Sequence, residues 1–309
     1  MTSKISSLLK STVALSALLL ASGASAGEPN ITTGRAQVYK QLAPESLEAV
    51  STPEEIKGLL ASNVAPTRIW KVLEHGEKLE CLACVPVVSK LLYNSNAKTR
   101  EISAWWLRRR IFGVFGPGQV YQQTLQTLEN TEATETRRAY AANALGEFLS
   151  LSGVPALSRA IANDESPLVR VAAVASLERL NSSGQDGALG LAMADGDENV
   201  RLTALHAATR INSFQDVEAV VALVSDSSSL VRRRAAETLG VMKAEDAVAG
   251  LMALASPDQE SDASVRGAAV WALGQIGSAE ARDVILAAQE DSDPFVRNAA
   301  GVAGRLLRL

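Results

Sequence analysis

The fold is decided by S-P-L-V-R-V-A-A-V-A-S-L-E-R-L, residues 166–180, and by S-S-L-V-R-R-R-A-A-E-T-L-G-V-M, residues 228–242. Each stretch places an apolar residue and an arginine ahead of an alanine-rich run. In the second stretch Val231, Leu239 and Met242 recur at helical spacing and mark one apolar stripe. Both stretches therefore predict amphipathic helices whose small side chains let neighbouring helices approach closely.

The same pattern recurs along most of the chain. Five clear units follow one another at steps of 31, 31, 34 and 31 residues, and two weaker units precede them. The anchor residues of the seven units are Arg100, Arg138, Arg170, Arg201, Arg232, Arg266 and Arg297. A fixed period of helical units predicts a stack in which each unit buries its apolar face against its neighbours.

A second column of residues supports this register. Six residues before each anchor the chain carries an acidic residue or Asn, namely Asn94, Glu132, Asp164, Asp195, Asp226, Glu260 and Asp291. An acidic residue in front of a helix can cap its unpaired N–H groups and suits its positive end. We expect these residues to cap the second helix of each unit and to pair with the arginine of their own or a neighbouring unit, so their role is structural.

These units resemble the HEAT repeat family, in the short bacterial form named after phycobilisome lyases. The resemblance covers roughly residues 80–309. It implies an all-α fold, a right-handed α-solenoid of stacked antiparallel helix pairs with the second helices on the concave side. It also implies that the protein binds another protein or peptide.

Enzymatic members of that family supply a contrast. The deoxyhypusine hydroxylases hold iron with repeated His-Glu pairs, whereas here Gly76 follows His75 and Ala207 follows His206. The chain also lacks a glycine-rich phosphate loop, a G-x-S-x-G elbow and an H-E-x-x-H helix. The sequence thus predicts no enzyme, no metal site and no cofactor.

The chain divides into four expected segments. Residues 1–26 have the basic start, short apolar run and Ala24-Ser25-Ala26 end of a secretory signal peptide. Residues 27–45 show no period and are expected to form a mobile leader, and residues 46–80 a helical pair or cap that begins with a capping box at Thr52. Residues 81–309 would then hold about seven HEAT-like repeats in an exported, periplasmic or extracellular protein of bacterial type.

Composition narrows the class of partner. The net charge of −4 provides no basic field for phosphates, so nucleic acid is not an expected partner. After the signal no segment approaches the roughly 20 apolar residues of a membrane span.

Cys81 and Cys84 are the only cysteines. Three interpretations stay open: a local structural disulfide, reduced and packed thiols, or a redox or metal function. A thioredoxin-like site is disfavoured because no βαβ pattern surrounds the pair.

Residues 105–121 interrupt the repeat with extra length, aromatic side chains and clustered arginines. Candidates for contact with a partner in this segment are Trp105, Arg108, Arg109, Arg110, Phe112 and Phe115. Tryptophan and arginine are frequent in binding hot spots. The alternative is a longer helix whose aromatic residues fill a larger local core and whose arginines are solvated.

Helical geometry adds two candidates. The position five residues after each anchor is expected to face away from the core, and it holds Trp105, His206 and Trp271. The sequence as a whole predicts an exported, protein-binding scaffold or adaptor that uses the concave surface. The alternative is a periplasmic redox or cofactor-associated protein that uses the Cys81–Cys84 pair.

Overall fold

The structure is a computed structural model that describes residues 51–61, 64–111 and 118–309. The expected signal peptide and leader lie outside these residues. Within them the chain forms helices and no strand, and Ser51–Leu309 make one compact unit. The expected all-α fold is confirmed.

The described chain begins with α4 (Pro53–Lys57) and α5 (Pro66–His75). Thr52 caps α4: its Oγ1 accepts from the N–H of Glu55, 3.2 Å away, while its own N–H donates to Glu55 Oε2 at 3.0 Å. This reciprocal pair is the capping box expected from the sequence. The apolar face of α5 is buried against the following helices, so α4 and α5 cover the start of the stack.

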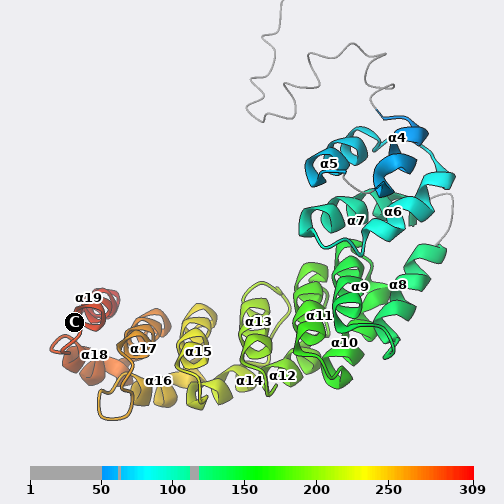
Figure 1. Cartoon of the computed structure of the whole chain (residues 1–309). Helices are drawn as coiled ribbons and strands as arrows, with labels where there is room; N and C mark the ends of the chain where they lie inside the picture. Colours follow the sequence, from blue (N-terminus) through cyan, green and yellow to red (C-terminus); the bar gives the residue numbers. More distant parts are fainter. Residues whose placement is uncertain (1–50, 62–63, 112–117) are drawn as a thin grey trace, which may run out of the picture. The chain divides into compact units, whose positions relative to one another are not determined.

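Seven helix pairs follow in the described residues, stacked in chain order (Figure 1). Their first helices are α6 (Val85–Leu91), α8 (Gln119–Glu129), α10 (Val154–Asn163), α12 (Asp186–Met193), α14 (Val217–Ala222), α16 (Val248–Leu254) and α18 (Arg282–Ala288). Their second helices are α7 (Ala97–Ile111), α9 (Glu135–Glu147), α11 (Pro167–Leu180), α13 (Glu198–Ala208), α15 (Ser229–Met242), α17 (Ala263–Ile276) and α19 (Pro294–Leu307). Short 3₁₀ turns precede or extend several first helices at Leu82–Cys84, Leu151–Gly153, Leu223–Ser225, Glu245–Ala247 and Ala279–Ala281.

The pairs form two layers, because from α9 onward each second helix packs mainly on the neighbouring second helices. The leucines seven residues after the anchors, Leu107, Leu145, Leu177, Leu239 and Leu273, are completely buried between the layers. Each contributes about 1.5–3 kcal/mol of hydrophobic free energy. Small residues bring the second helices together: a Cβ on Gly274 would lie only 2.7 Å from Ala303 Cα.

An ion-pair ladder joins consecutive repeats along the turns that precede the second helices. Each arginine reaches forward to the acidic residue of the next repeat. The Nε-to-carboxylate distances are 2.8 Å for Arg138–Asp164, 2.6 Å for Arg170–Asp195, 2.7 Å for Arg201–Asp226, 2.6 Å for Arg232–Glu260 and 2.9 Å for Arg266–Asp291. These side chains are largely buried, so the ladder fixes how one repeat sits on the next.

The acidic residues order the turn but do not cap the helix themselves, which corrects the expectation from the sequence. Asp226 Oδ1 accepts the backbone N–H of Ser228 at 2.8 Å, and Ser228 is the N-cap of α15. Arg232 completes the turn by donating to the Asp226 carbonyl oxygen, also at 2.8 Å. The carboxylate therefore holds the cap residue in place from two positions upstream.

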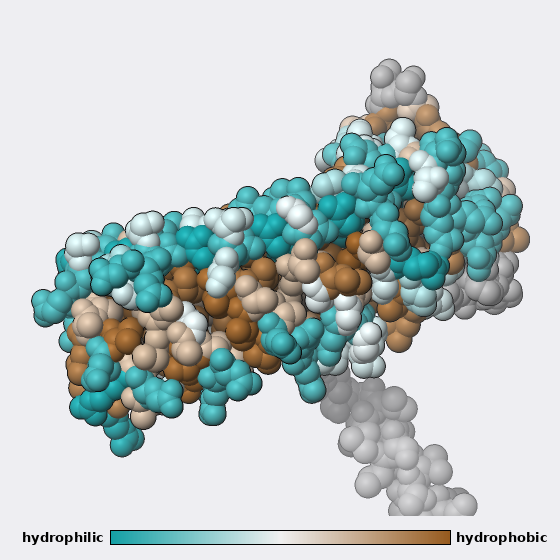
Figure 2. All heavy atoms as spheres, turned by 90° about the horizontal axis from the view of Figure 1, so that it is seen from below, coloured by the Kyte–Doolittle hydropathy of each residue, from teal (hydrophilic) through white to brown (hydrophobic). Residues whose placement is uncertain are grey.

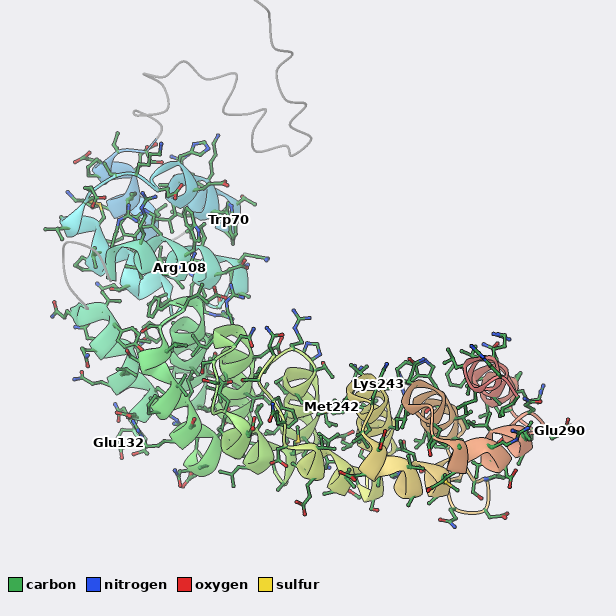
Figure 3. The ribbon with its side chains drawn as sticks, turned by 180° about the vertical axis from the view of Figure 1, so that it is seen from behind. Trp70, Arg108, Glu132, Met242, Lys243 and Glu290 are labelled. Atoms are coloured by element: carbon green, nitrogen blue, oxygen red, sulfur yellow. A yellow bond between two sulfur atoms is a disulfide. The ribbon has the colours of Figure 1, made fainter. Side chains whose placement is uncertain are left out.

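The link between the first repeat and the second departs from the ladder. Glu132 is exposed and projects from the turn between α8 and α9 (Figure 3). Its backbone N–H donates to Asn130 Oδ1 at 3.0 Å, so this turn is wound differently. Arg100, whose forward partner it would be, donates to the Asn94 carbonyl at 2.8 Å and lies over the ring of Tyr140, 3.8 Å from its centroid.

Candidate functional site

The arginine-rich end of α7 separates into a structural part and an exposed part. Trp106 is completely buried, and its Nε1 donates to the Gly76 carbonyl at 3.0 Å. Arg110 is 6% exposed and donates at 2.7 Å to each of the carbonyls of Trp106, Glu77 and Leu79. Burial lowers the pKa of its guanidinium to about 10. Arg110 is therefore committed to the packing of α5 against α7 and does not face a partner.

Arg108 and Arg109 lie on the outside of the same turn. Arg109 is exposed and forms an ion pair with Glu77, with Nη1 2.8 Å from Oε1. Arg108 is half-buried and points toward α9, with Nη1 3.5 Å from the Glu147 carbonyl oxygen (Figure 3). Phe112 and Phe115 lie outside the described residues. The cluster is thus reduced to two accessible arginines.

The residues expected to face away from the core lie apart from one another. Trp105 is half-buried and packs against the core of α7 and its neighbours. His206 on α13 is exposed, with Nε2 3.7 Å from Glu178 Oε1. Trp271 on α17 is half-buried, two second helices further along. We call the accessible surface of α7, α9, α11, α13, α15, α17 and α19 the second-helix face. It carries a groove towards each end of the stack. Between them a third groove, of about 700 Å³, is lined by Leu168, His206 and Leu230 among others.

The first groove crosses α7, α9, α11 and the end of α13 and has a volume of about 940 Å³. Small residues, among them Asn143 and Ala175, line its middle and leave room there. Its edges carry side chains of both charges from consecutive helices, namely Arg100, Glu101, Glu147, Glu178, Arg179 and Arg210. We refer to it as the polar groove.

Ion pairs between neighbouring helices shape the polar groove. Glu147 Oε2 of α9 lies 2.6 Å from Arg179 Nη2 of α11, and Glu178 Oε1 lies 2.6 Å from Arg210 Nε. Burial is the main influence on Glu147 and raises the pKa of its carboxyl group, against the attraction of Arg179. These charged groups are paired with one another yet remain partly open to solvent, so a partner can compete for them.

The second groove, of about 450 Å³, crosses α15, α17 and α19 and is mostly apolar. Val241, Trp271, Phe295 and Val302 line it, with Arg234 and Glu237 at its edge. We refer to it as the apolar groove. The sequence predicts Trp271 as a contact residue but not Phe295, which lies two residues before the anchor Arg297 and outside the column expected to face away from the core.

The two cysteines form a disulfide in the structure, with Sγ atoms 2.06 Å apart. Cys84 is completely buried and Cys81 is 8% exposed. The bridge lies directly before α6 and lines neither groove. Its position favours the structural interpretation among the three left open by the sequence.

The described residues contain no group of three or more His, Cys, Asp or Glu side chains that could hold a metal ion. None of the helices in residues 51–61, 64–111 and 118–309 combines the length and the apolar character needed to cross a membrane.

The chain resembles a known repeat family and several solved structures. A family model for HEAT repeats matches residues 186–263 and 257–303. No curated protein matches the chain. The X-ray structure of YibA from Escherichia coli is similar over 88% of this chain and 97% of its own, with 17% identity and a TM-score of 0.54.

Two further solved structures are more distant. Human deoxyhypusine hydroxylase is 18% identical over 85% of this chain and 96% of its own, with a TM-score of 0.37. The CpcE–CpcF complex of phycocyanin lyase from Nostoc sp. PCC7120 is 20% identical over 72% of this chain and 94% of the matched chain, with the same TM-score of 0.37. With TM-scores below 0.5 these two structures carry no argument about this chain, and at 17% identity YibA supports the fold alone. The chain thus has the α-solenoid fold of stacked helix pairs, and its residues 186–303 are HEAT repeats.

Proposed function

We propose that this protein is an exported scaffold or adaptor that binds another protein or peptide through its second-helix face. The observation that carries the proposal is the polar groove of about 940 Å³, which runs across four consecutive second helices. The groove is open and takes its lining from several consecutive helices, as a surface that receives an extended chain would.

The chemistry of the polar groove supports a polypeptide partner. Glu147–Arg179 and Glu178–Arg210 present both charges at its edge, while the small side chains of Asn143 and Ala175 leave room in the middle. Mixed polar rims around a contact area are typical of interfaces between proteins. A bound chain could exchange its own charged groups for those of the paired residues.

A steric test addresses the groove without removing any of its contacts. Ala175 is exposed in the middle of the groove, so Ala175→Arg should fill it and still suit a helix. The matched control is Ala249→Arg, because Ala249 is an exposed alanine of a first helix, α16. Tagged full-length protein would be used to capture partners from its native extract, with mass spectrometry to identify them.

The expected result is a partner retained by the wild type and the Ala249→Arg variant and lost by the Ala175→Arg variant. Equal capture by both variants would place the binding surface elsewhere. Failure of the wild-type protein to retain any partner reproducibly would overturn the proposal itself.

Export is part of the same proposal and rests on residues 1–26, with their basic start, apolar run and Ala24-Ser25-Ala26 end. Intact-mass analysis of natively produced protein should find Gly27 as the first residue. A chain that keeps Met1 or Thr2 and fractionates with cytoplasmic proteins would contradict export.

A further inference from the structure

The apolar groove is built by aromatic rings that rest on glycines of the preceding helix. A Cβ on Gly267 of α17 would lie 2.5 Å from the Phe295 ring, and a Cβ on Gly240 of α15 would lie 2.7 Å from Trp271 Cζ3. Any residue larger than glycine at position 240 or 267 would therefore overlap with the ring that lies there. The rings stand over the junctions between α15, α17 and α19 and turn three helices into one apolar surface.

This surface is unusually open for its chemistry. Val241 is 60% exposed and Phe295 is 58% exposed, although both are large apolar side chains. Single exposed apolar residues are ordinary, but here they line one groove together with Trp271 and Val302. A clustered apolar surface of this kind is what a binding partner would cover.

The rim of the apolar groove carries an excess of positive charge. Arg233 and Arg234 share a single carboxylate, Glu237, each at 3.0 Å. On α19 the exposed Arg305 lies three residues after Val302, which lines the groove, and therefore on the same side of the helix. It has no carboxylate within ion-pair distance among the described residues. The arginines beside the groove therefore outnumber Glu237, the one carboxylate that lines it, although the protein as a whole carries a net charge of −4.

Two carboxylates near the N-terminal ends of these helices do not cancel the excess. Asp262 accepts the backbone N–H of Ser264 at 2.8 Å, and Asp293 accepts that of Phe295 at 2.7 Å. Both are N-caps, held against the positive ends of α17 and α19. Their charge is therefore directed to the helix ends, and the guanidinium groups remain available to a ligand.

We infer that the apolar groove binds an acidic peptide segment with one or two large apolar anchors. The anchors would pack on Phe295, Trp271 and Val241, while the acidic flanks would pair with Arg234 and Arg305. The inference rests on the proposed function, because it names the kind of segment that one part of the second-helix face would accept.

Three labelled dodecapeptides of defined composition would test the inference by fluorescence anisotropy on the full chain. The first carries two central leucines between glutamates, the second the same leucines between lysines, and the third serines between glutamates. The first should bind at least tenfold more tightly than the other two, and its affinity should fall with added salt because exposed charges are screened. Equal binding of the glutamate and lysine peptides, or no binding of the first, would overturn the inference.

Variants then locate the binding. Phe295→Ala and the double charge reversal Arg234→Glu with Arg305→Glu should each weaken the first peptide at least tenfold. The matched controls are Leu191→Ala, a leucine 56% exposed on the first helix α12, and Arg282→Glu, an exposed arginine of α18; both should bind like the wild type. Circular dichroism melting of every variant separates lost binding from lost folding, and unaltered binding by folded Phe295→Ala and charge-reversal proteins would also overturn the inference.

The result is separable from the proposed function. If the peptides do not bind but Ala175→Arg abolishes capture of a natural partner, only the inference about the apolar groove fails. If the acidic peptide binds and no natural partner is captured, the inference stands on its own and the scaffold proposal fails.

Discussion

The guanidinium of Arg266 forms a bidentate ion pair with the carboxylate of Asp291 in the next repeat. Its Nε and Nη2 each donate to one of the two carboxylate oxygens at 2.9 Å. The side chains are only 6% and 2% exposed. Arg266 also donates to the Glu260 carbonyl of its own repeat at 3.1 Å. One side chain therefore links the turns of two repeats, and its repetition along the chain makes the ladder a determinant of stacking.

Removing a ladder carboxylate should cost more than removing the helix cap beside it. Asp226→Ala leaves Arg201 without its acidic partner and Ser228 without an acceptor for its N–H, so we expect a loss of about 3 kcal/mol. Ser228→Ala removes the Ser228 Oγ, which caps α15 by accepting from the N–H of Val231 and donates to the exposed Glu198, and should cost about 1 kcal/mol. Urea denaturation of both variants measures the difference; similar losses would mean that the ladder adds little beyond the cap.

The ladder also predicts the direction of pH dependence. The hydrogen bond from Arg266 lowers the pKa of the Asp291 carboxyl group and outweighs burial, which acts to raise it. Because the folded pKa lies below the unfolded value of about 4, the unfolded chain takes up the proton first. The stabilisation is therefore complete above about pH 4 and is lost as the pH falls through the lower folded pKa.

Urea midpoints measured between about pH 5 and 2 would show this dependence. Asp291→Asn should be less stable at neutral pH and should lose less stability on acidification than the wild type. Glu132→Gln is the control, because Glu132 belongs to the same sequence column but is exposed and outside the ladder. If the urea midpoint of Asp291→Asn fell with pH as steeply as that of the wild type, carboxylates other than Asp291 would cause the acid sensitivity.

Periodicity is enough to predict the helices and the buried leucine column, because both follow from spacing along one helix. The direction of the ladder could not be predicted in that way. Spacing places Arg170 near the acidic residue of its own repeat and of the next, and only the offset between stacked pairs brings Asp195 within 2.6 Å. The same limit explains Glu132, which has the right spacing but a differently wound turn.

Side-chain roles were harder to predict where a residue can be either solvated or buried. Arg108, Arg109 and Arg110 are equivalent in the sequence, yet the third fits against the carbonyls at the end of α5. Phe295 was not predicted because only the column five residues after each anchor was expected to face away from the core, and Phe295 lies outside that column. Gly267, on which its ring rests, was the available signal, but glycine in a helix has many causes.

The cysteine pair gives a prediction that separates the structural from the redox interpretation. Denatured, unreduced protein should show no reactive thiol, and reduction should release two. The bridge closes a very short loop, so by the chain-entropy estimate Cys81→Ala with Cys84→Ala should cost no more than about 2 kcal/mol. A bridge in the folded protein that dilute dithiol reduces readily and reversibly would favour the redox alternative, because burial of Cys84 should make it slow.

Adjacent arginines on α7 should differ sharply in their effect on stability. Arg110→Ala leaves the carbonyls of Gly76, Glu77 and Leu79 without that donor in a buried site, and we expect a loss of about 3 kcal/mol. Arg109→Ala breaks one exposed ion pair with Glu77 and should cost less than about 1 kcal/mol. Thermal melting of the two variants side by side tests this. Equal losses of stability would contradict the distinction between a structural Arg110 and an exposed Arg109.

The same division predicts where binding is affected without loss of folding. Arg108 and Arg109 stand on the accessible side of α7, and Arg108 reaches toward Glu147, which lines the polar groove. Arg108→Ala with Arg109→Ala should therefore weaken binding of the captured partner. The melting temperature should fall by only a few degrees, because neither arginine is fully buried and ion pairs at the surface stabilise the fold little. Undiminished binding would exclude a charged contact at this end of the groove. A large fall in melting temperature would instead give these arginines a structural role like that of Arg110.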